Sequence, residues 1–124
     1  DITERKQSEE ALQLSEEKFS KAFRSSANLI TITRLSDGKF IEVNENFLSI
    51  GGYRPEEVLG HTASDLKLWV NVEQRNELMA LLFQHGAFRN QECQFYTKSR
   101  DIKTGLISAE VINLRGVPCA LYVM

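Results

Sequence analysis

Apolar and polar positions follow the period of a strand in some segments of the chain and the period of a helix in others. Residues 29–35 are rich in β-branched side chains, and residues 40–43 alternate between apolar and polar ones, so both are typical of strands. Asp37 and Gly38 lie between them and favour a tight turn, because glycine accepts positive φ at little steric cost. The pattern therefore predicts a β-hairpin here.

Two short helices are predicted directly after the hairpin. Asn44 can accept hydrogen bonds from the first amides of a helix, and Gly51-Gly52 would end that helix. Pro55 suits the first position of a second helix because it lacks an amide that this position cannot use. Gly60 would terminate the second helix after about one turn.

A longer helix follows these two. Residues 61–70 are consistent with a short irregular helix, and residues 71–74 have the spacing of a capping box. In that box Asn71 caps the helix and the Gln74 side chain reaches back to the Asn71 amide. Apolar side chains after it cluster on one helical face, and Gly86 would end the helix.

Three strands are predicted in the last third of the chain. Residues 88–97 alternate, residues 100–105 form a polar turn that ends in glycine, and residues 106–114 form the next strand. Residues 115–116 make a second turn, and residues 117–124 form the last strand. Because tight connections join antiparallel neighbours, we expect a meander. Five strands interrupted by helices indicate an α+β fold with two layers.

The chain resembles the PAS domain family of sensory modules. The resemblance depends on the ordered combination of the Asp-Gly turn, FIEVN at 40–44, NENFLSIGGY at 44–53 and PEEVLG at 55–60. It implies a five-stranded antiparallel sheet of order 2-1-5-4-3, with helices on one face and a linker helix at the N-terminus. It covers essentially the whole chain.

The first residues also resemble part of this family. Asp1-Ile2-Thr3 is similar to the motif with which a PAS domain begins its exit helix, so residues 1–7 are expected to follow a preceding PAS domain. Residues 1–24 are then an N-terminal signalling helix, and residues 25–124 are the PAS domain itself. The last strand ends without such a motif, and we expect the sequence to stop before the exit linker.

The N-terminal helix carries a hydrophobic stripe. Leu12, Phe19 and Phe23 fall on one face of the predicted helix. This stripe is either the seam of a parallel coiled coil between two subunits or the face that packs on the sheet, and fewer than three heptads are present to decide. On the family resemblance we favour a homodimer, with this helix as the mechanical relay.

Composition narrows the classes of partner. The 124 residues carry a net charge of −2, with 42% hydrophobic and 26% charged residues, as in an ordinary soluble domain. No basic footprint for nucleic acid or an anionic membrane is present, and no apolar run is long enough to span a bilayer. Cys93 and Cys119 are too few for a disulfide framework or a zinc site. Buried free thiols in a reducing cytoplasm are the plainer interpretation.

Motifs of catalysis are missing from the sequence. It contains no Gly-rich phosphate loop, no His-Glu-x-x-His motif and no nucleophile elbow. Its carboxylate pairs lie at predicted helix starts, where the helix dipole explains them. We therefore expect no enzymatic activity in this chain, although its parent protein is expected to carry a kinase or diguanylate cyclase domain.

The sequence leaves the cofactor unknown but argues against two of the family's groups. Haem needs an inward-facing imidazole, whereas His85 lies beside a helix stop and His61 follows another. A photoreactive flavin needs a cysteine in residues 61–70, which contain none. Cys93 lies in a strand, where we expect a packed core thiol.

A pocket for a small molecule is conceivable between the helices and the sheet, although the same residues could form a filled core. A ligand site needs converging polar groups, for which Asn44, Asn113, Thr33 and Tyr53 are candidates. Asn44 competes for this role with helix capping, which we favour. The candidate lining consists of large apolar side chains and one thiol: Phe47, Trp69, Met79, Leu82, Cys93 and Phe95.

These patterns and the resemblance together predict a sensory and relay module without catalytic activity. The resemblance implies a cytoplasmic place in a bacterial sensor histidine kinase or diguanylate cyclase, beside further PAS and output domains of the same chain. A signal would bias two packings of the sheet against its flanking helix unequally. The alternative is a structural dimerisation or spacer domain with a filled core and no ligand.

Overall fold

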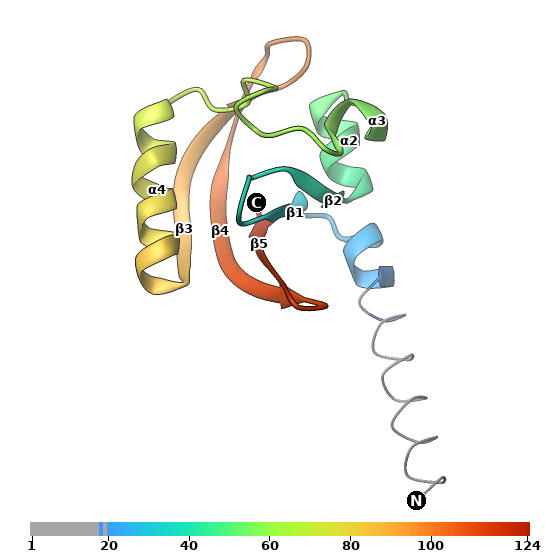
Figure 1. Cartoon of the computed structure of the whole chain (residues 1–124). Coiled ribbons are helices and arrows are strands. Elements are labelled where there is room, and N and C mark those ends of the chain that lie inside the picture. The colour runs from blue at the N-terminus through green and yellow to red at the C-terminus, as the bar shows by residue number, and fades with distance from the viewer. Residues whose placement is uncertain (1–17, 19) are drawn as a thin grey trace, which may run out of the picture.

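The computed structural model describes Lys18 and residues 20–124, of which residues 20–25 are helical. Five strands and three further helices follow in this part of the chain (Figure 1). In chain order they are β1 (Ile30–Arg34), β2 (Phe40–Val43), α2 (Glu45–Gly51), α3 (Pro55–Val58), α4 (Val72–His85), β3 (Ala87–Tyr96), β4 (Ile102–Leu114) and β5 (Val117–Val123).

The strands form one antiparallel sheet of order β2-β1-β5-β4-β3, which confirms the predicted topology. The last strand, β5, lies at the centre of the sheet and pairs with β1, so Thr31 lies opposite Tyr122 and Thr33 opposite Ala120. This pairing joins the predicted hairpin to the predicted meander. The two parts of the sequence thus share a single sheet.

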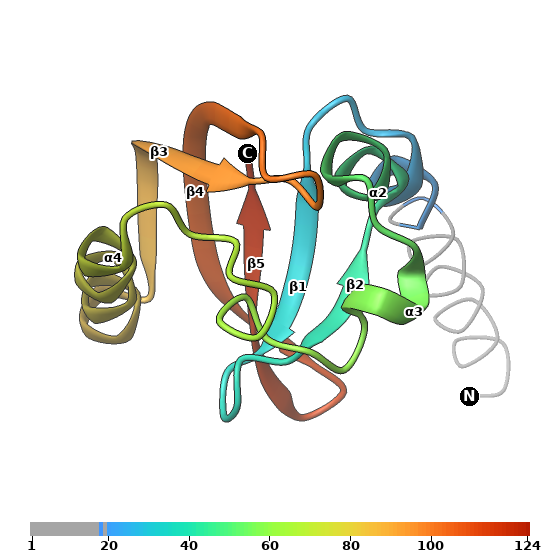
Figure 2. The same cartoon turned by 90° about the horizontal axis from the view of Figure 1, so that it is seen from above.

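The helices on the inner face of the sheet form two groups (Figure 2). α4 packs on β3 and β4, whereas α2 and α3 lie near β1 and β2 at the other end of the sheet. Residues 59–71 cross from one group to the other. The space between the two groups is therefore covered by an irregular segment rather than by a helix.

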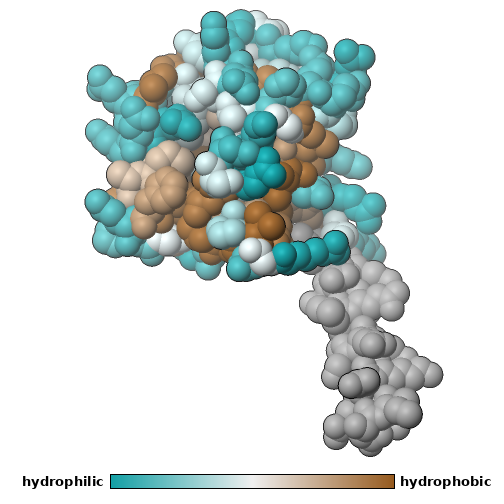
Figure 3. Space-filling model, in the orientation of Figure 1, coloured by the Kyte–Doolittle hydropathy of each residue, from teal (hydrophilic) through white to brown (hydrophobic). Residues whose placement is uncertain are grey.

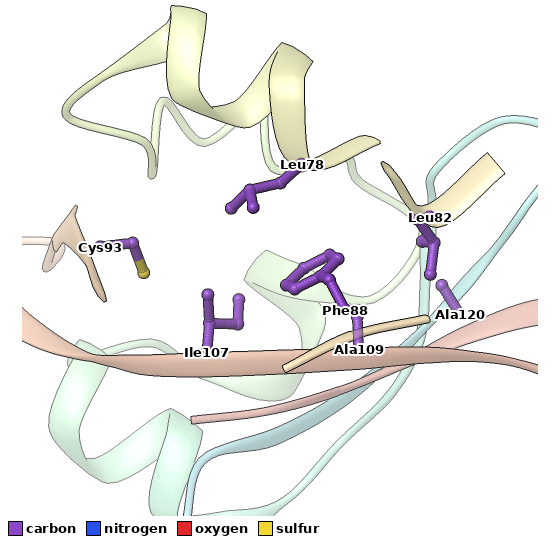
Figure 4. Close-up of a cluster of buried hydrophobic side chains, with 7 residues drawn as sticks. All are labelled: Leu78, Leu82, Phe88, Cys93, Ile107, Ala109 and Ala120. Carbon is purple, nitrogen blue, oxygen red and sulfur yellow. The ribbon is translucent and has the colours of Figure 1, made fainter. Parts of the chain in front are cut away.

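Side chains on the two faces of the sheet belong to separate hydrophobic clusters. On the inner face, Leu78 of α4 and Ile107 of β4 point toward one another in the cluster drawn in Figure 4. On the outer face, Ile32 and Cys119 are buried together with Phe23 of the N-terminal helical residues. Because neighbouring residues of a strand point to opposite faces, β4 and β5 contribute side chains to both clusters.

Residues 61–70 form turns, so the prediction of a short helix there is wrong. The Leu66 amide donates to the Thr62 carbonyl, but the next two amides donate to residues three and five positions back. Helical hydrogen bonds therefore do not propagate. Lys67 has a φ of 52°, which lies outside the right-handed helical region.

Two further local predictions need correction. The Asn71 side chain accepts from the Gln74 amide at 3.1 Å, as predicted, but the Gln74 side chain donates to the Glu92 carbonyl instead of returning to the cap. Residues 102–105 belong to β4 rather than to a turn. Gly105 pairs with Cys93, and a Cβ at Gly105 would lie 3.1 Å from the Met124 Cγ, so a side chain there would require the Met124 side chain to shift.

Candidate ligand cavity

A cavity of about 130 Å³ lies between the inner face of the sheet, α4 and the crossing segment. Most of the predicted pocket residues line it: Phe47, Trp69, Met79, Cys93 and Phe95. Leu82 does not, since its side chain is fully buried in the cluster between α4 and the sheet. The predicted set therefore divides into a cavity wall and one residue of the packed core.

The crossing segment forms one wall because its backbone pairs with β3. Trp69 bridges Phe95 in antiparallel fashion, and the Tyr96 amide donates to the Leu68 carbonyl at 2.7 Å. These bonds fix an otherwise irregular stretch and direct Ala63, Leu68 and Trp69 to the cavity. Backbone pairing with β3, rather than helix packing, therefore holds this wall of the cavity in place.

Hydroxyl groups from the central strands supply the neutral polar part of the lining. Thr31 and Thr33 line the cavity and are both buried. Tyr122 also lines it, and its hydroxyl donates to the Met79 Sδ at 3.5 Å. Burial raises the pKa of Tyr122, while the Thr33 hydroxyl and the Arg75 charge lower it to a smaller extent. The phenol therefore remains a neutral hydrogen-bond donor at neutral pH.

Arg75 is the charged side chain that sequence reasoning missed. It lies in the first turns of α4 and lines the cavity together with Met79, one helical turn further on. The sequence could have indicated this position of Arg75, because residues four apart in a helix share a face and Met79 was already a predicted pocket residue. Tyr122 and Thr31 were detectable in the same way, as polar side chains at inward-facing positions of central strands.

The other predicted polar candidates lie away from the cavity. Asn44 caps α2 by accepting from the Phe47 amide at 3.0 Å, which confirms the preferred role. Asn113 is exposed and accepts from the Gly116 amide in the last turn. Tyr53 is not part of the lining. Of the candidates, Thr33 alone reaches the cavity.

The size and chemistry of the cavity do not fit haem or a photoreactive flavin. Cavities of about 150 Å³ hold a molecule the size of benzene, and drug-sized ligands need roughly 300–1,000 Å³. His61 and His85 are exposed, and neither belongs to the lining. Cys93 is buried, which raises its pKa to about 11 and keeps the thiol protonated. The wall therefore suits a small molecule of few non-hydrogen atoms.

Clusters of metal ligands and membrane-spanning helices are both absent from the described residues. These residues contain no group of three or more His, Cys, Asp or Glu side chains that could hold a metal ion. Within residues 18 and 20–124, no helix has the length and apolar character needed to cross a membrane.

A family model described as a PAS domain matches residues 28–119, which is most of the chain. The chain belongs to the PAS domain family. No curated protein matches it at a significant level. The arrangement of sheet, helices and cavity described above is thus the arrangement of a PAS domain.

Solved structures similar to this PAS domain agree in fold. The PAS domain of an HTR-like protein from Haloarcula marismortui is 21% identical; the match covers 95% of this chain and 96% of that chain, with a TM-score of 0.72. A domain of a sensory box sensor histidine kinase/response regulator from Geobacter sulfurreducens is also 21% identical; the match covers 90% of this chain and 94% of that chain, with a TM-score of 0.74. The Rhodobacter sphaeroides LOV protein is 19% identical; the match covers 90% of this chain and 65% of that chain, with a TM-score of 0.71.

Of the three residues predicted to form the relay stripe, Phe23 is the one that the structure describes. Its side chain is 8% exposed and is buried with Ile32 and Cys119 on the outer face of the sheet. Leu12 and Phe19 lie outside the described residues. The helix therefore contacts the face opposite the cavity, and the sheet is the single layer between them.

Proposed function

We propose that this PAS domain is a sensory and relay module without catalytic activity in a bacterial signal-transduction protein. One observation carries the proposal: a cavity and a helix contact lie on opposite faces of the same central strand. Thr31 and Thr33 of β1 line the cavity, whereas Ile32 between them packs in the cluster that contains Phe23. A shift of β1 on one side must therefore affect packing on the other.

The relay works by unequal stabilisation of two packings. A small molecule in the cavity changes the free energy of the inner face, and it shifts the helix contact only if it binds one packing more tightly than the other. Protein interiors are close-packed, so a small displacement of β1 cannot be absorbed without repacking around Ile32. The N-terminal helix passes that difference to the rest of the chain.

We further propose that the parent protein is a cytoplasmic sensor histidine kinase or diguanylate cyclase with adjacent PAS and output domains, and that this domain forms a homodimer. Similar structures from sensor histidine kinases support the first parent. Exposed apolar side chains such as Phe83, at 66%, and Leu106, at 57%, support association with another surface. Hydrophobic residues also gather across the middle of the face in Figure 3.

A structural dimerisation or spacer domain is the second candidate. The buried contact of Phe23 with the outer face favours it, because that contact needs no ligand. The cavity separates the two candidates, since a spacer with a filled core binds no small molecule. A sensor gains stability from its ligand by mass action on the native state, and a spacer does not.

The test is native mass spectrometry of the purified chain, with chemical identification of any released small molecule and an absorbance spectrum. A sensor retains a small molecule or is stabilised by one from a panel of small organic molecules, and it forms a dimer. A dimer that neither retains nor responds to any molecule of the panel contradicts sensing and supports the spacer. Turnover of a substrate by the isolated chain would refute both candidates.

A further inference from the structure

The charge around the cavity distinguishes between classes of small molecule. Among the described residues that line it, Arg75 has the one formally charged side chain, and none is Asp or Glu. The neutral polar side chains of the lining include the hydroxyls of Thr31, Thr33 and Tyr122 and the amide of Gln94, which donates to the Thr104 hydroxyl. A wall of hydroxyl donors and one guanidinium stabilises an anion and offers no counter-charge to a cation.

The positive charge lies at the same end of the cavity as the Tyr122 hydroxyl. Arg75 precedes Met79 by one turn of α4, and Met79 accepts from Tyr122. The Arg75 charge also acts on the phenol, since it lowers the Tyr122 pKa against the larger effect of burial. Arg75, Tyr122 and Thr33 therefore form one polar end, and the aromatic side chains form the rest.

The half-buried Arg75 guanidinium has few protein partners among the described residues. Its side-chain hydrogen bond goes from Nη1 to the Asn76 Oδ1 and is long, at 3.4 Å. Within the described part of the chain, no carboxylate forms an ion pair with Arg75, whereas Arg34 and Arg89 each have one and Arg54 has two. Most of its five N–H donors thus have no protein acceptor in this region.

On the basis of the sensory function proposed above, we propose that the cavity takes a short-chain monocarboxylate. Its carboxylate accepts from the Arg75 guanidinium, because a planar guanidinium matches the two carboxylate oxygens. It also accepts from the Tyr122 hydroxyl, whose single proton then leaves its 3.5 Å bond to the Met79 Sδ. Its hydrocarbon tail packs against Trp69 and Phe95, which line the apolar part. The volume of about 130 Å³ restricts the tail to a few carbons.

Isothermal titration calorimetry of the full 124-residue chain with three matched probes tests this assignment. Butanoate, butanamide and n-butylammonium have similar shapes but carry negative, zero and positive charge. We expect butanoate to bind most tightly, and decanoate to bind more weakly because its tail exceeds the cavity. Arg75→Gln should weaken butanoate binding roughly 10- to 100-fold, the effect of losing charge-assisted hydrogen bonds. Arg75→Lys should restore part of it.

Arg115→Gln is the matched control, since it removes the same charge from an exposed turn. It should leave the affinity for butanoate unchanged. Circular dichroism of each unliganded variant shows whether it is folded, and the comparison of butanoate with butanamide on the unaltered chain needs no variant at all. Equal or tighter binding of butanamide, or an unchanged affinity in Arg75→Gln, overturns the carboxylate assignment but leaves sensing intact. Binding of no probe also overturns it, and sensing itself is then decided by the native mass spectrometry above.

Discussion

Asn44 connects three backbone segments through one buried side chain. Its Oδ1 accepts from the amides of Ile30 and Phe47, and its Nδ2 donates to the Asn28 carbonyl at 2.8 Å. The residue is 1% exposed, so water cannot replace these partners. A single amide therefore fixes the start of α2 relative to β1, the strand that also lines the cavity.

We predict that Asn44→Ala lowers the free energy of unfolding by about 2–4 kcal/mol, because it removes a helix cap and leaves a buried amide without an acceptor. The matched control is Asn71→Ala, which removes the corresponding cap of α4 at an exposed position. It should cost about 1 kcal/mol. Urea denaturation measures both values. Equal losses in the two variants would show that the buried bonds of Asn44 contribute nothing beyond capping.

Single residues were predictable from sequence where the interaction is local. The Asn44 cap depends on a donor three residues away, so spacing alone indicates it. The spacing of Arg75 and Met79 indicates that they share a helical face, but their position beside Tyr122 of a distant strand depends on tertiary packing, which no local pattern contains. Leu82 was predicted, with other large apolar residues, to line either a pocket or a filled core. The structure places Leu82 in the core and Met79 at the cavity, a distinction that depends on tertiary packing.

At the scale of elements, α3 and the β3–β4 hairpin are tied together by one carboxylate. The Glu57 Oε2 lies 2.6 Å from the Lys98 Nζ, and the Glu57 Oε1 accepts from the Arg54 amide at 3.0 Å. The Lys98 amide also donates to the Gly51 carbonyl. The Lys98 contact, followed by the Arg54 amide, lowers the Glu57 pKa to about 2. The tie therefore requires the ionised carboxylate.

We predict that this tie gives the domain an acid-sensitive component of stability. The folded pKa of Glu57 is below its ordinary value of 4.5, so its contribution is complete above pH 4.5 and is lost as pH falls toward 2. Glu57→Gln should lower the melting temperature at pH 7. Between pH 4.5 and pH 2, the melting temperature of this variant should fall less steeply than that of the unaltered chain. The control is Glu56→Gln, whose carboxylate is exposed and lies 3.6 Å from Arg54. If the melting temperatures of Glu57→Gln and of the unaltered chain fall by the same amount between pH 4.5 and pH 2, Glu57 does not contribute this acid-sensitive stability.

Elements with a strong local signal were predicted correctly, and those without one were not. The hairpin turn, both short helices and α4 begin and end near turn or cap residues, whose chemistry acts locally. Residues 61–70 carry helix formers, but backbone pairing with β3 holds them in turns. Residues 102–104 are exposed at the hairpin tip, and this short stretch before Gly105 has no buried position whose alternation would indicate a strand. In both segments, backbone pairing with β3 determines the conformation, and the local sequence does not indicate that pairing.

At the scale of the whole molecule, one sheet separates two sites that differ in kind. The inner site is a cavity with one charged residue, and the outer site is the contact of Phe23 with Ile32 and Cys119. Sequence patterns could predict the sheet order only through the family resemblance, because strand alternation does not specify which strands pair. Once the order is known, alternation along β1 assigns each side chain to one site or the other.

The last prediction concerns the coupling between these two sites. If the module is a relay, Phe23→Ala should change the affinity for whichever butanoate-series probe binds by about fivefold or more, the lower range of typical allosteric coupling. Phe83→Ala is the matched control, because it truncates the same side chain at a 66% exposed position of α4. It should leave the affinity unchanged. Titration calorimetry measures both variants.

Reciprocity supplies a second readout on the unaltered chain. Coupling free energy acts in both directions, so a probe in the cavity must also change how often the Phe23 contact opens. Cys119 lies fully buried in that contact, and its rate of alkylation reports the opening. Peptide mapping by mass spectrometry separates its modification from that of Cys93. An affinity that Phe23→Ala leaves unchanged, together with a Cys119 rate that the probe leaves unchanged, would show that the two sites are not coupled and that the domain does not relay ligand binding through this helix.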